Sequence, residues 1–279
     1  MQDSMDSYET VIKPRQKWKL IDIAELWKYR ELFLIFVWRD LKVRYKNTLL
    51  GILWVIFQPL LVTFVFTIFF GKVAKISSEN LPYLLFVFIG LIFWTFFSSA
   101  VTQASNSFIE NENILKKVYF PKEILPLSSI VTGLVDLSIN LIILVIFILY
   151  FEIIPATVTL IVITLGVSIT FLTASGLGLL LSSLNVKYRD IRYILPFFIQ
   201  IFLFLTPVIY PLSTLRDSLR IILLLNPLAG VIESTRSAIG GSSHLDYGIL
   251  TVSLVSSIVI FLLGLIYFRT TERFFADII

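Results

Sequence analysis

The stretch LPYLLFVFIGLIFWTFFSSAVTQASNSFI, Leu81–Ile109, runs for 29 residues without one charged side chain. An α-helix needs about 20 mainly apolar residues to cross the hydrocarbon core of a bilayer, so this stretch is predicted to span a membrane. The whole chain agrees, because 57% of its 279 residues are hydrophobic, 15% are charged and the mean hydropathy is +0.90. Soluble domains average about 45–50% apolar and about 25% charged residues.

Five more runs are apolar and long enough to cross: Leu49–Gly71, Ile124–Phe151, Ile153–Val186, Ile191–Leu212 and Gly248–Phe268. The sequence therefore predicts an all-α, polytopic membrane protein whose six transmembrane helices lie within residues 49–268. Gln58-Pro59 interrupts the first run and predicts a kink there. Small residues spaced four apart at Ala174, Gly178 and Ser182 predict close helix packing.

The N-terminal run Leu20–Trp38 is apolar in part, but it contains five charged residues, including Asp22 and Arg30. Charges at the centre of a span cost about 3 kcal/mol each, so insertion of this run would cost roughly 10 kcal/mol. We expect an amphipathic helix in the membrane plane, about Ile21–Trp38, within a cytoplasmic segment of residues 1–48. The basic stretch Trp38–Lys46 is expected to follow it at the lipid headgroups. The candidate interfacial residues are Trp27, Arg30, Trp38 and Arg39.

Lysine and arginine predict the orientation of the chain. With six spans, the segments on the side of both termini carry 18 Lys and Arg residues, and the opposite loops carry 5. Cytoplasmic loops are the ones enriched in these residues, so both termini, including the tail 269–279, are expected in the cytoplasm.

One further apolar run, Ile221–Ile232, is too short to cross and is broken at Asn226-Pro227. Non-helical backbone at membrane depth survives only where protein or a cavity surrounds it. We therefore expect an external re-entrant helical hairpin at roughly Leu212–Gly240. A loop that folds onto the headgroups is the alternative.

The segment ENENILKKVYFPKEILP, Glu110–Pro126, carries six charges between two apolar runs, and the orientation above makes it a cytoplasmic loop. Ile114, Leu115, Val118 and Tyr119 form a short apolar stripe, and Pro121 ends the helical turn. Such a helix either lies on lipid or occupies a groove of another protein. Composition alone does not choose between these two.

Several kinds of chemistry have no support in these residues. There is no Cys, His244 is the single histidine, and a net charge of +4 is too small and dispersed to indicate nucleic acid. No GxxxxGK[ST] phosphate loop occurs, since Val73 follows the only Gly-Lys pair. We predict no catalytic residue, metal site or cofactor in this chain. A secondary transporter is one alternative, but it would be expected to have an internal repeat, and none is found in this sequence. A membrane enzyme is another, and it would need clustered acids, a histidine or a bound metal near the interface.

Polar and aromatic residues within the spans are candidates for a substrate path. The inner half of the second span carries Ser98, Ser99, Thr102, Gln103, Ser105 and Asn106, which either bind substrate or join helices. Aromatic side chains either line the path of a substrate or face lipid, and the candidates are Phe93, Trp94, Phe97, Phe197, Phe202 and Tyr210. Asp136 is the one carboxylate deep within a span, with Asn140 one turn on. It faces either a structural partner or the substrate.

The order of these features resembles the permease subunit of type-2 ABC exporters, specifically those that export O-antigen and related polysaccharides. The matching blocks are WRDLKVRYKNTLLGILWVIFQP (Trp38–Pro59), NILKKVYFPKEILP (Asn113–Pro126), LNVKYRDIRYILP (Leu184–Pro196), TPVIYP (Thr206–Pro211) and NPLAGVIESTR (Asn226–Arg236).

The resemblance implies a homodimer that pairs with two copies of a separate ATPase, and the ATPase holds the ATP and Mg. It implies a lipid-linked polysaccharide substrate, contacts with membrane lipids, no nucleic acid, and a place in the bacterial inner membrane. The loop between spans two and three would be a coupling helix that docks in the ATPase: Asn111, Glu112, Asn113, Ile114, Leu115, Lys116, Lys117, Val118, Tyr119 and Phe120. The hairpin would be an external gate, with Tyr210, Pro211, Asn226, Pro227 and Arg236. Teichoic acid, capsule, or another lipid or drug-like cargo remains an alternative.

Overall fold

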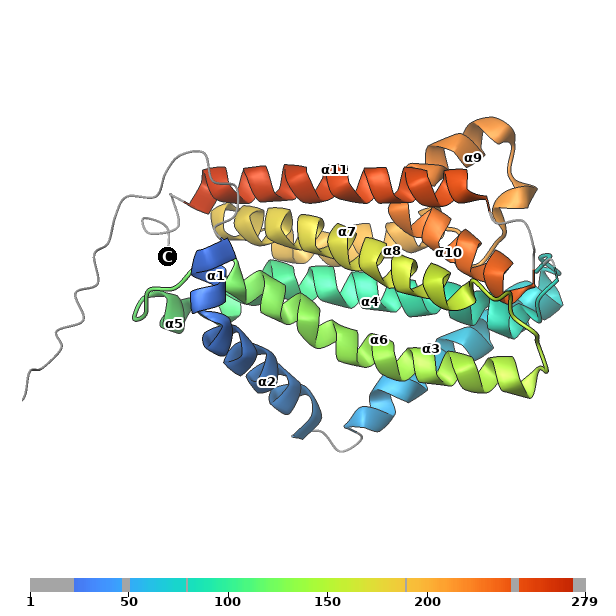
Figure 1. The fold of residues 1–279 in the computed structure, drawn as a ribbon, viewed down its shortest axis with the longest axis horizontal. Helices are drawn as coiled ribbons and strands as arrows, with labels where there is room; N and C mark the ends of the chain where they lie inside the picture. The colour runs from blue at the N-terminus through green and yellow to red at the C-terminus, as the bar shows by residue number, and fades with distance from the viewer. Residues whose placement is uncertain (1–22, 47–50, 79, 189, 242–245, 273–279) are drawn as a thin grey trace, which may run out of the picture.

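The computed structural model describes residues 23–46, 51–78, 80–188, 190–241 and 246–272, and every regular element in these ranges is helical (Figure 1). The predicted all-α, polytopic class is confirmed. Within these ranges, five stretches of helix are long and apolar enough to cross a membrane, or six if a bent pair of shorter helices counts as one span. The five are α3 (Ile52–Phe66), which η1 (Thr67–Val73) continues, and α4 (Tyr83–Glu110), α6 (Ile124–Tyr150), α7 (Thr159–Lys187) and α11 (Tyr247–Glu272).

Most ends of these spans lie close to the predicted positions, and one differs by six residues. The predicted span Ile153–Val186 begins only at Thr159, in α7. Pro155 lies in the gap, and proline disfavours helical backbone in the residue before it. The start of the first predicted span, residues 49–50, falls outside the described part of the chain.

The fifth predicted span is wrong in its length. Helix α8 (Ile191–Leu205) has 15 residues and stops seven residues before Leu212. At 1.5 Å per residue it is about 22 Å long, shorter than the hydrocarbon core. It ends because Thr206 is extended, as expected for a residue that precedes a proline, here Pro207.

Helix α4 is the centre of the bundle and the most buried of the five long helices. It packs against α6, α7, α3, α8 and α10 (Pro227–Ile239). Phe86, Phe88 and Phe93 on α4 are among the largest fully buried side chains of the protein. At Gly178, an added Cβ would lie 2.8 Å from the Ala104 Cβ, so α7 approaches α4 very closely there, at the small-residue spacing noted above.

The N-terminal helix is longer than predicted. It forms as α1 (Ile23–Lys28) and α2 (Arg30–Lys46), so the expectation that it ends near Trp38 is wrong. The basic stretch is itself helical, since Arg, Lys and Leu are all good helix formers. Residues 21–22 of the predicted helix lie outside the described part.

The predicted hairpin begins with a short 3₁₀ turn, η2 (Leu212–Thr214), and contains α9 (Asp217–Leu224) and α10, which bend by 106° at the break between them. Two helices joined at a sharp break agree with the helical part of that prediction. The re-entrant position of the hairpin in a membrane stays a prediction.

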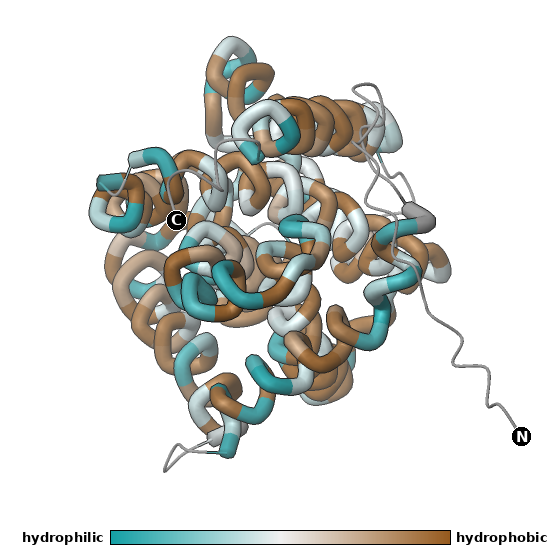
Figure 2. Tube along the Cα trace, turned by 90° about the vertical axis from the view of Figure 1, so that its left-hand side faces the viewer, coloured by the Kyte–Doolittle hydropathy of each residue, from teal (hydrophilic) through white to brown (hydrophobic). Residues whose placement is uncertain are grey.

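The connecting segments gather at two ends of the bundle. Helices α1 and α5 (Glu112–Leu115) and the last turn of α11 lie at one end, and α9 lies at the other (Figure 1). Figure 2 looks onto the first of these ends and shows hydrophilic residues on turns and helix ends, with hydrophobic helices behind them. This sorting suits a membrane-crossing bundle. Which end faces the cytoplasm stays a prediction from the Lys and Arg distribution.

The contact between α7 and α11 yields a stability test. A methyl group on Gly264 would collide with the carbonyl oxygen of Gly176, and one on Gly176 would lie 2.6 Å from the Phe261 Cα. Gly264→Ala should therefore destabilise the bundle by about 1–3 kcal/mol through overpacking. Thermal unfolding in detergent measures this effect. Leu263→Ala, on the exposed face of the same turn, is the control and should change stability by less than about 0.5 kcal/mol.

Candidate functional site

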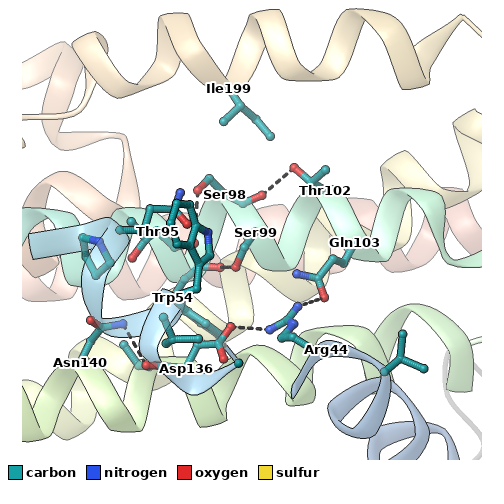
Figure 3. A pocket seen from close by; sticks show the side chains of 17 residues that line it. Arg44, Trp54, Thr95, Ser98, Ser99, Thr102, Gln103, Asp136, Asn140 and Ile199 are labelled. Carbon is teal, nitrogen blue, oxygen red and sulfur yellow. Dashed lines mark hydrogen bonds and ion pairs between the residues drawn. The ribbon is translucent and has the colours of Figure 1, made fainter. Parts of the chain in front are cut away.

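A cavity of about 1000 Å³ opens between the end of α2, the first half of α3, and the facing sides of α4 and α6 (Figure 3). Ile199 from α8 completes it. Its volume is at the upper end of the 300–1,000 Å³ typical of ligand pockets. The polar side chains in its wall are Arg44, Gln58, Thr95, Ser98, Ser99, Thr102, Gln103, Asp136 and Asn140, and Trp54 is its one tryptophan.

Helix α4 contributes a row of hydroxyl groups to this cavity. Thr95, Ser98, Ser99 and Thr102 are three or four residues apart and therefore lie on one face of the helix. Each hydroxyl donates to a backbone carbonyl three or four residues earlier, as Thr102 Oγ1 does to Ser98 O at 2.7 Å. Because the donor hydrogens are used within the helix, the row offers lone pairs that accept hydrogen bonds from a ligand.

A charged cluster forms the wall opposite. Arg44 at the end of α2 forms an ion pair with Asp136 of α6 and donates to Gln103 of α4, and the Tyr45 hydroxyl donates to the second oxygen of Asp136. Burial, and then the hydrogen bond to Asp136, raises the pKa of the Tyr45 phenol well above its usual range, so the phenol stays protonated and donates. The intramembrane acid thus has partners within its own chain.

The predicted channel residues lie in the cavity wall, in the core of the bundle, on the exposed face of α8 and, in the case of Asn106, in a contact between helices. Ser98, Thr102 and Asp136 line the cavity. The aromatic residues Phe93, Trp94 and Phe97 are buried in the core of the bundle, away from it. Phe197 and Phe202 are exposed on α8.

Two polar residues near the C-terminal end of α4, Ser105 and Asn106, join helices and do not line the cavity. Asn185 of α7 donates from its amide to the Ser105 carbonyl at 2.9 Å and to Asn106 Oδ1 at 3.2 Å. Sequence reasoning missed Arg44, Trp54 and Gln58. An acidic residue within a span, such as Asp136, is expected to have a basic partner. If the N-terminal helix had been predicted to continue beyond Trp38, Arg44 would have been a candidate for that partner.

The predicted coupling helix, residues 111–120, is shorter than expected. Only α5, Glu112–Leu115, is helical, and after the turn at Lys116–Lys117 the chain runs without regular structure to Pro121. Pro121 again disfavours helical backbone in the residue before it, Phe120.

The segment has an inner and an outer side. On the inner side, Phe120 is buried with its ring centroid 5.7 Å from that of Phe36 in α2, and Asn111 Oδ1 accepts from Arg39 Nη1 at 2.6 Å. The outer side carries Lys117, Val118 and Tyr119, and the last two are 52% and 64% exposed. Two apolar side chains that face solvent beside lysines suit contact with another surface.

The loop 111–120 and helix α2 therefore pack together as one unit. Phe36 and Phe120 belong to one buried cluster, and Ile114 and Leu115 pack against it. The start of α6 joins this end of the bundle to α11, because the buried carboxylate of Glu123 pairs with Arg269 at 2.5 Å.

At the other end, side chains hold the broken backbone after α8. Asn226 caps α10 by accepting from the Leu228 N–H at 3.1 Å, and its amide donates to Thr206 Oγ1 at 2.9 Å. Pro227 takes the first position of α10, where its missing N–H costs nothing. The Tyr210 hydroxyl donates to the Phe204 carbonyl at 3.0 Å.

Arg236 of α10 forms the strongest of these anchors. Its guanidinium donates to the carbonyls of Phe86 at 3.1 Å, Pro207 at 2.7 Å and Val208 at 2.7 Å, and lies 3.5 Å from the centroid of the Phe86 ring. Tyr83 donates to the next carbonyl, that of Ile209, at 2.8 Å. Arg236 is one of the five Lys and Arg residues assigned above to the opposite loops, but it is only 3% exposed and therefore is not a loop cation. The remaining 18 to 4 bias points the same way.

Comparisons with known proteins agree on one family. A family model described as ABC-2 type transporter matches residues 31–239. The chain is 34% identical over 215 residues to the O-antigen export system permease protein RfbA of Myxococcus xanthus, over 76% of this chain and 81% of that protein. It is 28% identical over 259 residues to RfbA of Klebsiella pneumoniae (89% and 95%) and 22% identical over 240 residues to the polysialic acid transport protein KpsM of Escherichia coli (84% and 91%).

The Arg236 anchor can be tested directly. Arg236→Met keeps much of the side-chain volume but leaves three buried carbonyls without their donor, so it should destabilise the protein by about 3–5 kcal/mol. Arg216→Met, at an exposed position before α9, is the matched control and should change stability by less than about 0.5 kcal/mol. Thermal unfolding in detergent compares the two. Equal effects would contradict an anchoring role for Arg236.

Proposed function

The chain belongs to the ABC-2 type transporter family, and we propose that it is the permease subunit of an ATP-driven polysaccharide exporter. The cargo is a lipid-linked glycan that moves from the cytoplasm across the bacterial inner membrane. The observation that carries this is the 34% identity, over 76% of the chain, to a protein named as an O-antigen export permease. Relatives named for O-antigen and for polysialic acid favour a glycan over a drug-like lipid.

The energy for transport comes from a second polypeptide. These 279 residues contain no GxxxxGK[ST] phosphate loop, so ATP and Mg are bound by an ATPase subunit. Two permeases and two ATPases form the complex, as in the exporters that the chain resembles. Both termini of the permease lie in the cytoplasm, which places the loop 111–120 on the side of the ATPase.

The exposed side of this loop is the docking surface for the ATPase. Lys116, Lys117, Val118 and Tyr119 reach the partner, whereas Ile114, Leu115 and Phe120 hold the loop to its own chain. When the ATPases close, the loop moves and takes α2 with it, because the Arg39–Asn111 hydrogen bond ties the two together. The far end of α2 carries Arg44, so the movement changes the wall of the cavity.

The cargo passes the cavity and leaves through the hairpin. The hydroxyl row of α4 and the cluster at Asp136 suit a hydroxyl-rich ligand, since every sugar hydroxyl can both donate and accept. At the opposite end, α10 is almost wholly buried and anchored by Arg236, whereas Leu219, Ile221 and Ile222 of α9 are exposed. A fixed α10 with an apolar α9 beside it suits an external gate at membrane depth.

Co-purification tests the subunit assignment. The tagged chain, extracted from its native cell in mild detergent, should bring down an ATPase in equal amount. An ATPase that is absent from the purified complex contradicts the proposal.

Charge reversal tests the docking surface. Lys116→Glu with Lys117→Glu should lower ATP-driven export by about tenfold, the effect of about 1.4 kcal/mol lost from docking. The same variant should also reduce the amount of ATPase that co-purifies. Export of labelled glycan into inverted vesicles measures the first effect, and protein quantification measures the second.

The matched control uses the two lysines at the opposite end of the bundle. Lys72→Glu with Lys75→Glu makes the same charge change on exposed side chains, and export should stay within about twofold of the unaltered protein. If the control lost export and the change at Lys116 and Lys117 had no effect, the proposed docking surface would be contradicted, because the ATPase would then contact the end of the bundle that carries Lys72 and Lys75.

A further inference from the structure

The charges that line the cavity cancel. Among the described residues of its wall, Arg44 and Asp136 alone carry charge, and they are paired with each other. The other polar groups of the wall are hydroxyls and amides. The cavity therefore has no net charge, although basic residues are plentiful elsewhere in α2, where Arg39, Lys42 and Lys46 lie outside its wall.

Each member of the Arg44–Asp136 ion pair has a further hydrogen-bond partner. One oxygen of Asp136 accepts from Arg44, and a second nitrogen of Arg44 donates to Gln103 (Figure 3). The other oxygen of Asp136 accepts from the Tyr45 hydroxyl. The two side chains are 24% and 19% exposed, so solvent screens them only in part. Asp136 therefore already neutralises the positive charge of Arg44 that a ligand would meet.

An anionic ligand would be poorly accommodated in such a wall. Removing an ion from water costs several kcal/mol, and an opposite charge must offset this cost. A carboxylate 4 Å from Asp136 would be repelled by about 4 kcal/mol at an effective dielectric constant of 20. That repulsion is about as large as the attraction that Arg44 offers, so no net gain remains.

An uncharged sugar fits the same wall well. Its hydroxyls can donate to the row Thr95, Ser98, Ser99 and Thr102, whose own hydrogens are used within α4. Trp54, 51% exposed, projects from α3 into the cavity and offers an aromatic face to the apolar C–H side of a sugar ring (Figure 3). Planar amide and carboxylate groups at Gln103, Asn140 and Asp136 can then fix the orientation of the ring.

We propose that this cavity is a binding subsite for uncharged sugar units and that the Arg44–Asp136 pair makes it select against acidic glycans. The inference rests on the proposed function, and it narrows the cargo class. Glycans with a carboxylate or phosphate in each repeat, including teichoic acids, are disfavoured by this subsite.

Binding of two matched probes tests the subsite. Heptagalacturonate carries a carboxylate on every sugar, and its fully methyl-esterified form has the same backbone without charge. Titration calorimetry with the purified full-length chain in lipid nanodiscs should show the ester binding at least about tenfold more tightly than the acid.

Two variants move the selectivity in a defined direction. Asp136→Asn leaves the charge of Arg44 uncompensated and should raise affinity for the acid about tenfold, whereas Arg44→Gln with Asp136→Asn restores neutrality and the preference for the ester. Gln58→Lys adds a cation to the wall without touching the pair, so it should also favour the acid, even if Asp136→Asn unfolds.

Three outcomes would overturn the inference. The acid could bind as tightly as the ester, the added cations could leave selectivity unchanged, or neither probe could bind. Each result is distinguishable from failure of the proposed function, because co-purification of the ATPase is measured separately and does not depend on the cavity.

Discussion

Backbone N–H and C=O groups that are buried must find partners within the protein, and the arrangement of the chain after α8 follows from that constraint. Two prolines, Pro207 and Pro211, keep the segment after α8 from being helical, so its carbonyls need donors from elsewhere. Arg236 of α10 and Tyr83 of α4 supply them. A guanidinium can serve several carbonyls at once, because it has five N–H donors in a rigid plane. The position of α10 in the core is thus tied to the point where α8 breaks.

Buried charge follows the same rule beside the cavity. A carboxylate within a span is stable only with a partner, and Asp136 finds Arg44 and Tyr45 at the end of α2. That pairing holds α2 against α6, while Phe36 and Arg39 hold the same helix to the loop at the end of α4. One helix therefore packs against the loop that carries the surface proposed for the ATPase and also forms part of the wall of the cavity. A transporter whose motor is a separate polypeptide needs such a physical link between the two.

Hydropathy predicted the long helices well and the short ones poorly. Spans such as Leu81–Ile109 are long apolar runs, and lipid leaves the backbone no alternative to a helix. The predicted bounds of α7 and α8 were wrong because Pro155 and Pro207 interrupt helical backbone there, whereas apolar composition continues past α8 and before α7. Helix α2 was cut short at Trp38 because its charges were assigned to lipid headgroups, and the ion pair that draws Arg44 inward joins residues 92 positions apart in the chain.

The sequence by itself determined the all-helical membrane class, the apolar runs, the helix break at Asn226-Pro227 and the lack of a phosphate loop, because each depends on local composition or on a short motif. Only the tertiary structure decided which polar residues share a cavity. Ser98 and Ser105 lie on the same helix and look alike in sequence, yet one faces the cavity and the other bonds to Asn185 of α7. The physical reason is that burial and pairing depend on which helices pack against each face, and those neighbours come from distant parts of the chain.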